Sequence, residues 1–346
     1  MSDLPPTLFV GLSAEGPGGI QRFNRRVLAA LTAIGAPARC VMLNDAPVNG
    51  DRLRLMRAIG RAARSAPVLL LGHVNLLPVA AGYRLMNPAG RVMLFAHGIE
   101  VWGDPAYRRV RRWEPAAMRA LVDRVAVVSD FSRDRMTAAF GIAPDRFHLF
   151  PNAVDLPPPA GASGGGPPTV LAVARLGAGE REKRVDDLIR ALPIVAASVP
   201  EARLMIIGEG PLRAELAGLA ATLGVGKRVD LLGGVDEMAL TQAYAGARAF
   251  ALPSTKEGFG IVYLEAWARG VPVVAAKGGA PAAMIADGVD GYTVPPGDVP
   301  ALAAALIALL TNPEAAAGMG AAGRAKVQQC YSAPAFNANL RRLLQR

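Results

Sequence analysis

The chain has 346 residues, of which 52% are hydrophobic and 5% aromatic, and a formal net charge of +10. This length allows two ordinary domains that each bury a core, and no apolar run reaches the roughly 18 to 20 residues of a membrane span. Residues 1–155 carry 20 Arg and 12 acidic residues, an excess that favours an anionic partner such as a phospholipid surface, a lipid pyrophosphate or nucleic acid. A coding bias toward Arg is the alternative explanation.

The N-terminus and the cysteines bear on location. Residues 1–6 lack the basic start and apolar stretch of a signal peptide, so we expect a cytoplasmic protein, and peripheral attachment to the inner face of the membrane stays open. Cys40 and Cys330 have neither metal-ligand spacing nor the pattern of a disulfide framework, which predicts free thiols.

Short apolar segments alternate with amphipathic stretches in the first half of the chain. This pattern is typical of α/β proteins with parallel sheets. Strands are predicted at residues 7–12, 38–43, 67–71, 92–96, 124–128 and 147–150, and helices between them include 20–34 and 51–64. The Pro- and Gly-rich residues 157–168 cannot form a packed element, which predicts a linker.

The same alternation restarts after the linker. Strands are predicted at residues 169–174, 203–207, 229–232, 249–252, 271–275 and 291–294, and the chain from 300 onward is almost wholly helical, with breaks near 312–313 and 332–334. We therefore predict a first domain at 1–156, a linker at 157–168, a second domain at 169–330, and a C-terminal helix at 331–346 that can pack back on the first domain. In open sheets of this type ligands bind at the carboxyl ends of the strands.

Residues 253–266 follow a predicted strand and open a predicted helix. Gly258 and Gly260 allow close approach of the backbone to a ligand, and a helix start presents N–H groups and a positive dipole end to a phosphate. Glu257 precedes the helix and Glu265 lies about one turn inside it, so both are candidates to accept hydrogen bonds from sugar and ribose hydroxyls. A capping acid plus a solvated helix residue is the alternative, which the surrounding glycines disfavour.

The stretch from Glu257 to Glu265 resembles the E-x7-E motif of retaining GT-B glycosyltransferases, specifically family 4 of the glycosyltransferases. The resemblance covers nearly all of the second domain and, more loosely, the first. Further segments in the family's order are 173–176 with Lys183 and 185–189, 206–211, 229–233, 270–274, Gly18-Gly19, His97-Gly98, 129–132 and 151–155. The resemblance implies an α/β protein of the GT-B fold, with two Rossmann-like doubly wound domains facing across a cleft, the first on the acceptor side and the second binding the nucleotide sugar.

The resemblance also implies roles for individual residues. Arg175 and Lys183 would clamp the donor's diphosphate, and fixed cations suit a leaving group that gains negative charge; Arg181 and Arg184 remain alternatives for the Lys183 contact. With Glu257 and His97 they form the catalytic set, in which His97 hydrogen-bonds to the transferred sugar. The donor-binding set adds Gly18, Gly19, Gly208, Val235, Gly258, Phe259, Gly260, Ile261 and Glu265.

The function implied is transfer of a hexose, with retention and without a metal or cofactor, from GDP-mannose or a UDP-hexose. The acceptor would be a glycan or a lipid-linked molecule in cell-surface polysaccharide, lipopolysaccharide or glycolipid biosynthesis. A non-catalytic protein that binds sugar nucleotides is the alternative. A dehydrogenase is disfavoured because Arg213 stands where the third glycine of a dinucleotide fingerprint belongs, and no recognition motif supports nucleic-acid binding.

Two groups of arginines predict that the first domain docks on an anionic membrane. The first group has the spacing of one helix face and comprises Arg54, Arg57, Arg61 and Arg64. The second mixes cations with amphipathic rings, as interfacial segments do, and comprises Tyr107, Arg108, Arg109, Val110, Arg111, Arg112 and Trp113. A solvated surface is the alternative for both groups.

Overall fold

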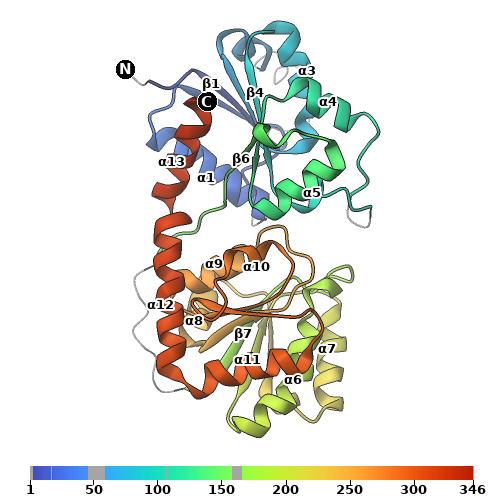
Figure 1. Cartoon of the computed structure of the whole chain (residues 1–346), viewed down its shortest axis with the longest axis vertical. Coiled ribbons are helices and arrows are strands. Elements are labelled where there is room, and N and C mark those ends of the chain that lie inside the picture. The colour runs from blue at the N-terminus through green and yellow to red at the C-terminus, as the bar shows by residue number, and fades with distance from the viewer. Residues whose placement is uncertain (1–2, 17, 46–58, 106–107, 158–165, 346) are drawn as a thin grey trace. The chain divides into compact units, whose positions relative to one another are not determined.

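The computed structural model describes residues 3–16, 18–45, 59–105, 108–157 and 166–345. The chain forms two compact units: unit 1 comprises Met1–Asn152 with Ala333–Arg346, and unit 2 comprises Ala153–Ser332 (Figure 1). Each unit contains one six-stranded parallel sheet. The prediction of two parallel α/β sheets is therefore confirmed.

Unit 1 is an open sheet with helices packed on it. Its strands are β1 (Thr7–Gly11), β2 (Ala38–Met42), β3 (Val68–Leu71), β4 (Arg91–Ala96), β5 (Arg124–Val127) and β6 (Phe147–Leu149), and its helices include α1 (Gly19–Ala33), α3 (Leu77–Met86), α4 (Glu114–Leu121), α5 (Asp130–Phe140) and α13 (Ala333–Gln345). The strand order is β2-β1-β3-β4-β5-β6, so the direction of winding reverses between β1 and β3. Ligands of such sheets bind outside the carboxyl ends of the strands at this switch point.

The last helix, α13, is part of unit 1 although it ends the chain (Figure 1). The ring of Phe336 lies 5.8 Å from that of Phe23 in α1 and 4.7 Å from that of Phe150. Arg91, at the start of β4, donates a hydrogen bond to the Leu344 carbonyl at 2.8 Å. These contacts make α13 a structural element of this unit.

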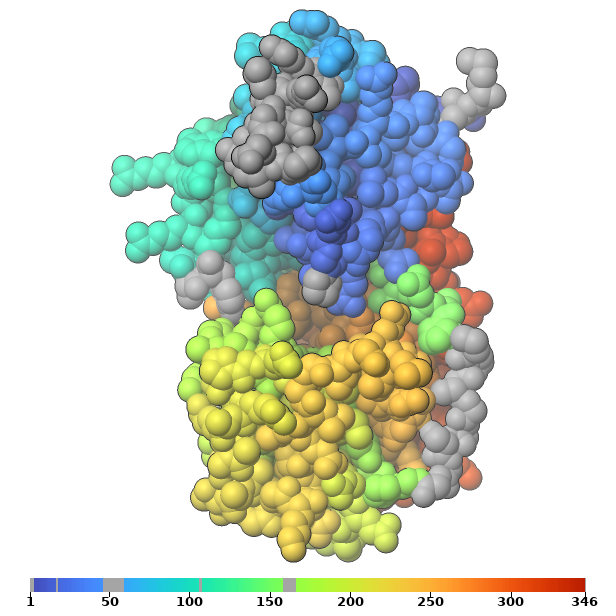
Figure 2. Space-filling view, turned by 180° about the vertical axis from the view of Figure 1, so that it is seen from behind, coloured from blue at the N-terminus to red at the C-terminus, as the bar shows by residue number. Residues whose placement is uncertain are grey.

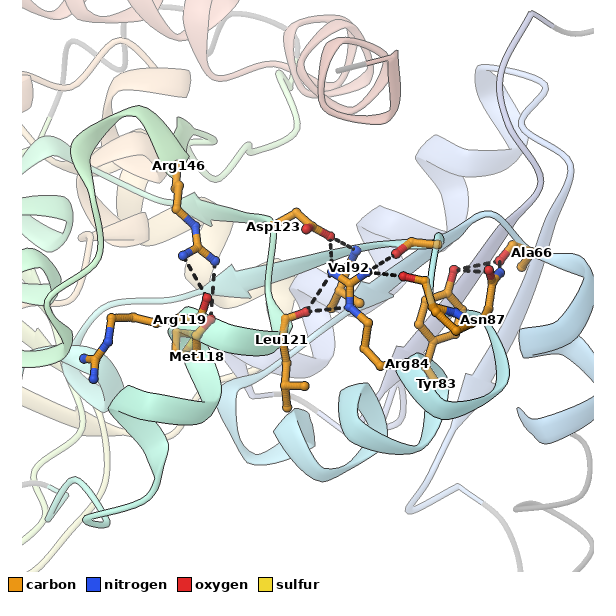
Figure 3. Close-up of polar contacts among 12 residues, drawn as sticks. Ala66, Tyr83, Arg84, Asn87, Val92, Met118, Arg119, Leu121, Asp123 and Arg146 are labelled. Atoms are coloured by element: carbon orange, nitrogen blue, oxygen red, sulfur yellow. Dashed lines mark hydrogen bonds and ion pairs between the residues drawn. The ribbon is translucent and has the colours of Figure 1, made fainter.

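Polar contacts join α3, α4 and β4 at the amino ends of the strands (Figure 3). Arg84 donates to the Leu121 carbonyl at 3.2 Å and pairs with Asp123 at 2.6 Å. Asp123 also accepts the N–H of Val92 at 2.6 Å. Because this edge of the sheet lies opposite the carboxyl ends of the strands, we assign the cluster a structural role.

Unit 2 repeats the design with a Rossmann-like strand order. Its strands are β7 (Thr169–Val173), β8 (Arg203–Ile207), β9 (Val229–Gly233), β10 (Ala249–Leu252), β11 (Val273–Ala276) and β12 (Gly291–Val294), and its helices are α6 (Val185–Ser198), α7 (Leu212–Thr222), α8 (Glu237–Gly246), α9 (Ile261–Ala268), α10 (Ala280–Met284), α11 (Val299–Thr311) and α12 (Pro313–Cys330). The order is β12-β11-β10-β7-β8-β9, which puts the switch point between β7 and β10.

Glycines allow α12 to approach α9 closely in unit 2. A Cβ on Gly320 would lie 1.8 Å from the Gly270 carbonyl oxygen, and one on Gly323 would lie 2.0 Å from Trp267 Cδ1. Trp267 is fully buried, and its indole N–H donates to the Asp290 carbonyl at 2.7 Å. Larger side chains at these two positions would separate the helices.

The twelve predicted strands correspond to β1–β12, with shifts at some ends. β11 begins at Val273, two residues later than predicted, because the Val271 N–H bonds to the Ala266 carbonyl at the end of α9 and Pro272 has no N–H to give the sheet. Most of the predicted helix 51–64 lies outside the described residues, although residues 59–65 are helical. Cys40 and Cys330 are exposed free thiols.

Among the described helices, no single one is both long and apolar enough to cross a membrane. Only by length and composition does the bent pair Val299–Thr311 with Pro313–Gln345 together match a membrane span.

Candidate active site

Two loops with predicted site residues begin at the switch point of unit 2. The loop after β7 carries Arg175 and leads to η4 (Arg181–Lys183), and the loop after β10 carries Glu257. Lys183 Nζ lies 2.5 Å from Glu257 Oε2, and the two side chains are 13% and 17% exposed. The strand order thus joins a cation and a carboxylate that are 74 residues apart in the sequence.

Hydrogen bonds from the loop after β10 hold η4 in place. The Glu182 carbonyl accepts the N–H of Thr255 at 2.9 Å and the hydroxyl of the buried Ser254 at 3.2 Å. These bonds tie Glu182, which precedes Lys183, to Ser254 and Thr255, which lie shortly before Glu257, and so they bring Lys183 opposite Glu257. Sequence reasoning missed Ser254, since a serine in a loop gives no sign of such a partner.

The other cations of this segment pair with other acids. Arg175 Nη2 lies 2.5 Å from Glu180 Oε1, and Arg181 forms two hydrogen bonds to Glu215, at 2.6 and 2.7 Å. Arg184, the N-cap of α6, has a left-handed backbone with φ at 55° and binds Asp187 in the first turn of that helix. Lys183 is thus the cation of this segment that pairs with Glu257, and which of Lys183, Arg181 and Arg184 contacts the diphosphate stays a prediction.

The loop after β8 packs directly on the backbone near Arg175. Gly208 and Gly210 have φ values of 148° and 145°, and a Cβ on either would lie within 2.1 Å of a carbonyl oxygen of Ala174 or Leu176. Leu176 N–H also bonds to the Glu209 carbonyl at 2.8 Å. Glycine is required here by the close approach of two loops.

The half-buried Val235 follows on the next loop along the sheet. The N–H of Gly234, beside it, donates to Glu209 Oε1 at 3.2 Å, which ties the loop after β9 to the loop after β8. The predicted donor residues Gly208 and Val235 thus lie on two connected loops at the same edge of the sheet.

The start of α9 follows Glu257 and presents mainly backbone. Gly260 is the N-cap, with φ at 95°, and Gly258 and Phe259 are buried. The Phe259 ring lies 6.1 Å from that of Tyr331 and is buried, so this side chain packs within unit 2. Ile261 begins the helix, and the half-buried Glu265 accepts a hydrogen bond from the Tyr244 hydroxyl at 3.2 Å.

In unit 1, Gly18 and Gly19 form the start of α1 near the end of β1. Gly18 is the N-cap and supplies no side-chain cap, and both glycines are exposed. Arg25 fixes the preceding loop by donating to the carbonyls of Ala14 and Gly16 at 2.6 and 2.9 Å. The first turn of α1 therefore has the features of an anion-binding helix start.

His97 follows β4 at the same edge of the sheet. Its Nε2 lies 2.8 Å from the Gly72 carbonyl oxygen, and since a carbonyl only accepts, Nε2 carries the proton. In the neutral ring this leaves Nδ1 as an acceptor for a ligand hydroxyl. The His97 N–H donates to Glu100 Oε1 at 2.5 Å, a positioning contact that sequence reasoning missed.

His73 lies beside His97 but has a structural role. Its Nδ1 accepts the N–H of Asn75 at 3.1 Å, and the two imidazole rings stack at 6.1 Å. Burial lowers the pKa of His73 to about 4, so this ring is neutral at neutral pH. Among the described residues, no group of three His, Cys, Asp or Glu side chains is arranged to hold a metal ion.

Two parallel six-stranded units with candidate residues at their switch points define the class of GT-B glycosyltransferases. HepE of Anabaena in complex with UDP has a similar structure, with a TM-score of 0.78 and 20% identity over 98% of this chain and 99% of that one. The lipopolysaccharide outer core galactosyltransferase WaaB is also similar, with a TM-score of 0.71 and 19% identity over 97% and 98% of the two chains.

Sequence comparisons define the family. Residues 159–326 match the family model described as glycosyl transferases group 1, and residues 17–157 match that described as glycosyltransferase family 4. The chain is 36% identical to the GDP-mannose-dependent alpha-(1-6)-phosphatidylinositol monomannoside mannosyltransferase of Mycolicibacterium smegmatis, over 75% of this chain and 69% of that protein. The protein of the same name from Mycobacterium tuberculosis is 36% identical over 88% and 81%. The chain belongs to glycosyltransferase family 4 and is a glycosyltransferase, which confirms the family resemblance.

Proposed function

We propose that this glycosyltransferase transfers a hexose, with retention of anomeric configuration, from a nucleoside-diphosphate sugar to a lipid-linked acceptor. The observation that carries the proposal is the similarity to the two mannosyltransferases, whose names specify GDP-mannose and a phosphatidylinositol mannoside. GDP-mannose is therefore the first donor to test, and a UDP-hexose the second. A glycan acceptor is the alternative to the lipid.

The site of unit 2 supports the donor half of this proposal. Lys183 and Arg175 are cations at the switch point, where they would meet the charge that grows on the departing diphosphate. Glu257 would accept hydrogen bonds from the transferred sugar, and Glu265 from the ribose. His97 would accept one from a sugar hydroxyl through Nδ1.

The surface of unit 1 supports an acceptor in a membrane. Arg61, Arg64, Arg109, Arg111 and Arg112 are exposed, and Trp113 is 43% exposed. Figure 2 shows side chains of the teal residues beyond 100 projecting from this unit. We propose that these cations hold the enzyme on an anionic leaflet, each contributing on the order of 1 kcal/mol.

One member of the second arginine group has a different partner. Arg108 pairs with Glu114, whose side chain is buried, and also donates to the Glu100 carbonyl at 3.1 Å. Arg108 is thus an internal residue and does not belong to the proposed membrane surface. Arg54, Arg57 and Tyr107 lie outside the described residues.

The test is turnover with defined donors. The purified chain is incubated with GDP-mannose, UDP-glucose or UDP-galactose and a membrane lipid extract, and glycosylated lipid is detected by mass spectrometry. We expect product from one donor, with the donor's anomeric configuration retained. Donor binding without any glycosylated product would favour the non-catalytic alternative, and an inverted product would contradict retention.

A further inference from the structure

Each cation on the loop between β7 and α6 is paired with an acid. Arg175 pairs with Glu180 and Lys183 with Glu257, both at 2.5 Å, while Arg181 pairs with Glu215 at 2.6 Å. An anionic ligand that approaches Arg175 or Lys183 must therefore compete with a carboxylate that the chain itself supplies. Glu257 has a proposed task at the sugar, whereas Glu180 has none.

The local backbone explains why Glu180 reaches Arg175. The Glu180 N–H bonds to the Gly177 carbonyl at 2.9 Å, which closes a tight turn, and the Lys183 N–H bonds to the Glu180 carbonyl at 2.9 Å. A Cβ on Gly177 would lie 3.3 Å from Glu180 Cγ, so the glycine leaves room for the acid to fold back. The turn fixes the position of Glu180 independently of any ligand.

The two partners differ in accessibility. The Arg175 side chain is 81% exposed and that of Glu180 is 23% exposed. The guanidinium is thus free to exchange partners in solvent, while the acid is held by the turn. Phosphate oxygens are strong competitors for such a guanidinium because they accept two parallel hydrogen bonds from it.

We propose that Glu180 is a resident counter-ion of Arg175 that sets the affinity of the site for a nucleoside diphosphate. This inference rests on the proposed role of Arg175 at the diphosphate. On donor binding, the guanidinium leaves Glu180 for phosphate oxygens; after transfer, Glu180 takes the guanidinium back and speeds release of the nucleoside diphosphate. An exposed ion pair of this kind corresponds to a change of about two- to five-fold in dissociation constant.

The test measures binding of GDP and of UDP to the whole chain by calorimetry. Glu180→Gln keeps the size of the side chain and removes its charge, so we expect the dissociation constant of the nucleotide that binds to fall about two- to five-fold. Glu215→Gln is the matched control, because it makes the same change in net charge but releases Arg181 instead of Arg175. Binding of the uncharged nucleoside should not change in either variant.

Arg175→Gln separates this inference from the proposed function. If Arg175→Gln weakens diphosphate binding but Glu180→Gln does not tighten it, the counter-ion role is wrong and the clamp stands. Equal tightening by Glu180→Gln and Glu215→Gln would show a general charge effect and also overturn the inference. If Arg175→Gln binds as tightly as the parent chain, both the clamp role of Arg175 and the inference fail. When Glu180→Gln is added to Arg175→Gln, it should not change the dissociation constant further, because the partner of Glu180 is already absent.

Discussion

Replacing Lys183 by Met tests the central contact of the site. The ammonium lies 2.5 Å from Glu257, and both side chains are more than four-fifths buried. Removing it leaves a carboxylate with little access to water, so we expect the free energy of unfolding to fall by about 1–3 kcal/mol. Because the cation proposed to meet the leaving group is also lost, transfer should fall by about 10²- to 10³-fold.

The Glu257→Gln variant and the double variant Lys183→Met with Glu257→Gln separate stability from catalysis. The double variant has neither charge, so its free energy of unfolding should recover toward that of the parent chain, whereas its transfer rate should stay low. Unfolding is followed in urea, and kcat/KM is measured with the active donor. Arg181→Gln, which removes a neighbouring cation bound to Glu215, is the control and should retain most transfer.

Two results would refute this reasoning. Transfer close to that of the parent chain in Lys183→Met would remove the ammonium from the mechanism. Recovery of both stability and transfer in the double variant would show that Lys183 acts only by neutralising Glu257. We expect instead that the double variant recovers its free energy of unfolding but does not recover transfer.

Three further predictions concern the packing of α12, the metal requirement and the membrane surface. Gly323→Ala should lower the free energy of unfolding by about 1–3 kcal/mol, because its Cβ would meet Trp267. Gly318→Ala, whose Cβ would have nothing within 4 Å, should raise the free energy of unfolding by about 0.5–1 kcal/mol. Equal effects of the two substitutions in urea unfolding would contradict the packing argument. Transfer should survive extensive chelation by EDTA, because Arg175 and Lys183 are proposed to meet the charge of the diphosphate. A loss of transfer that Mn²⁺ or Mg²⁺ restores would contradict the prediction of transfer without a metal. The chain should sediment with anionic liposomes more at low than at high salt. Each of Arg111→Gln and Arg112→Gln should weaken this binding by about five-fold. Equal binding to neutral liposomes would rule out the docking surface.

The sequence predicts the sheets well and the partners of the site residues poorly. Fully apolar runs such as 68–71 and 249–252 have few alternatives to a buried parallel strand, so their positions were predictable. The pairing of Arg175 with Glu180 depends instead on the turn at Gly177, and that of Arg108 with Glu114 on the chain path before α4. Neither pairing follows from spacing, since both acids have several cations nearby in the sequence.

The loops at the site of unit 2 are joined to one another largely through main-chain groups. The Glu182 carbonyl accepts the Thr255 N–H, and the Leu176 N–H bonds to the Glu209 carbonyl. Such bonds need no particular side chain, and the glycines at 208 and 210 are required only for the close approach of the backbones. The framework that holds Lys183 and Glu257 can therefore persist while the exposed side chains of these loops vary. Differences in donor affinity within this framework should then arise at positions such as Glu180, which touch a site cation without forming part of the framework.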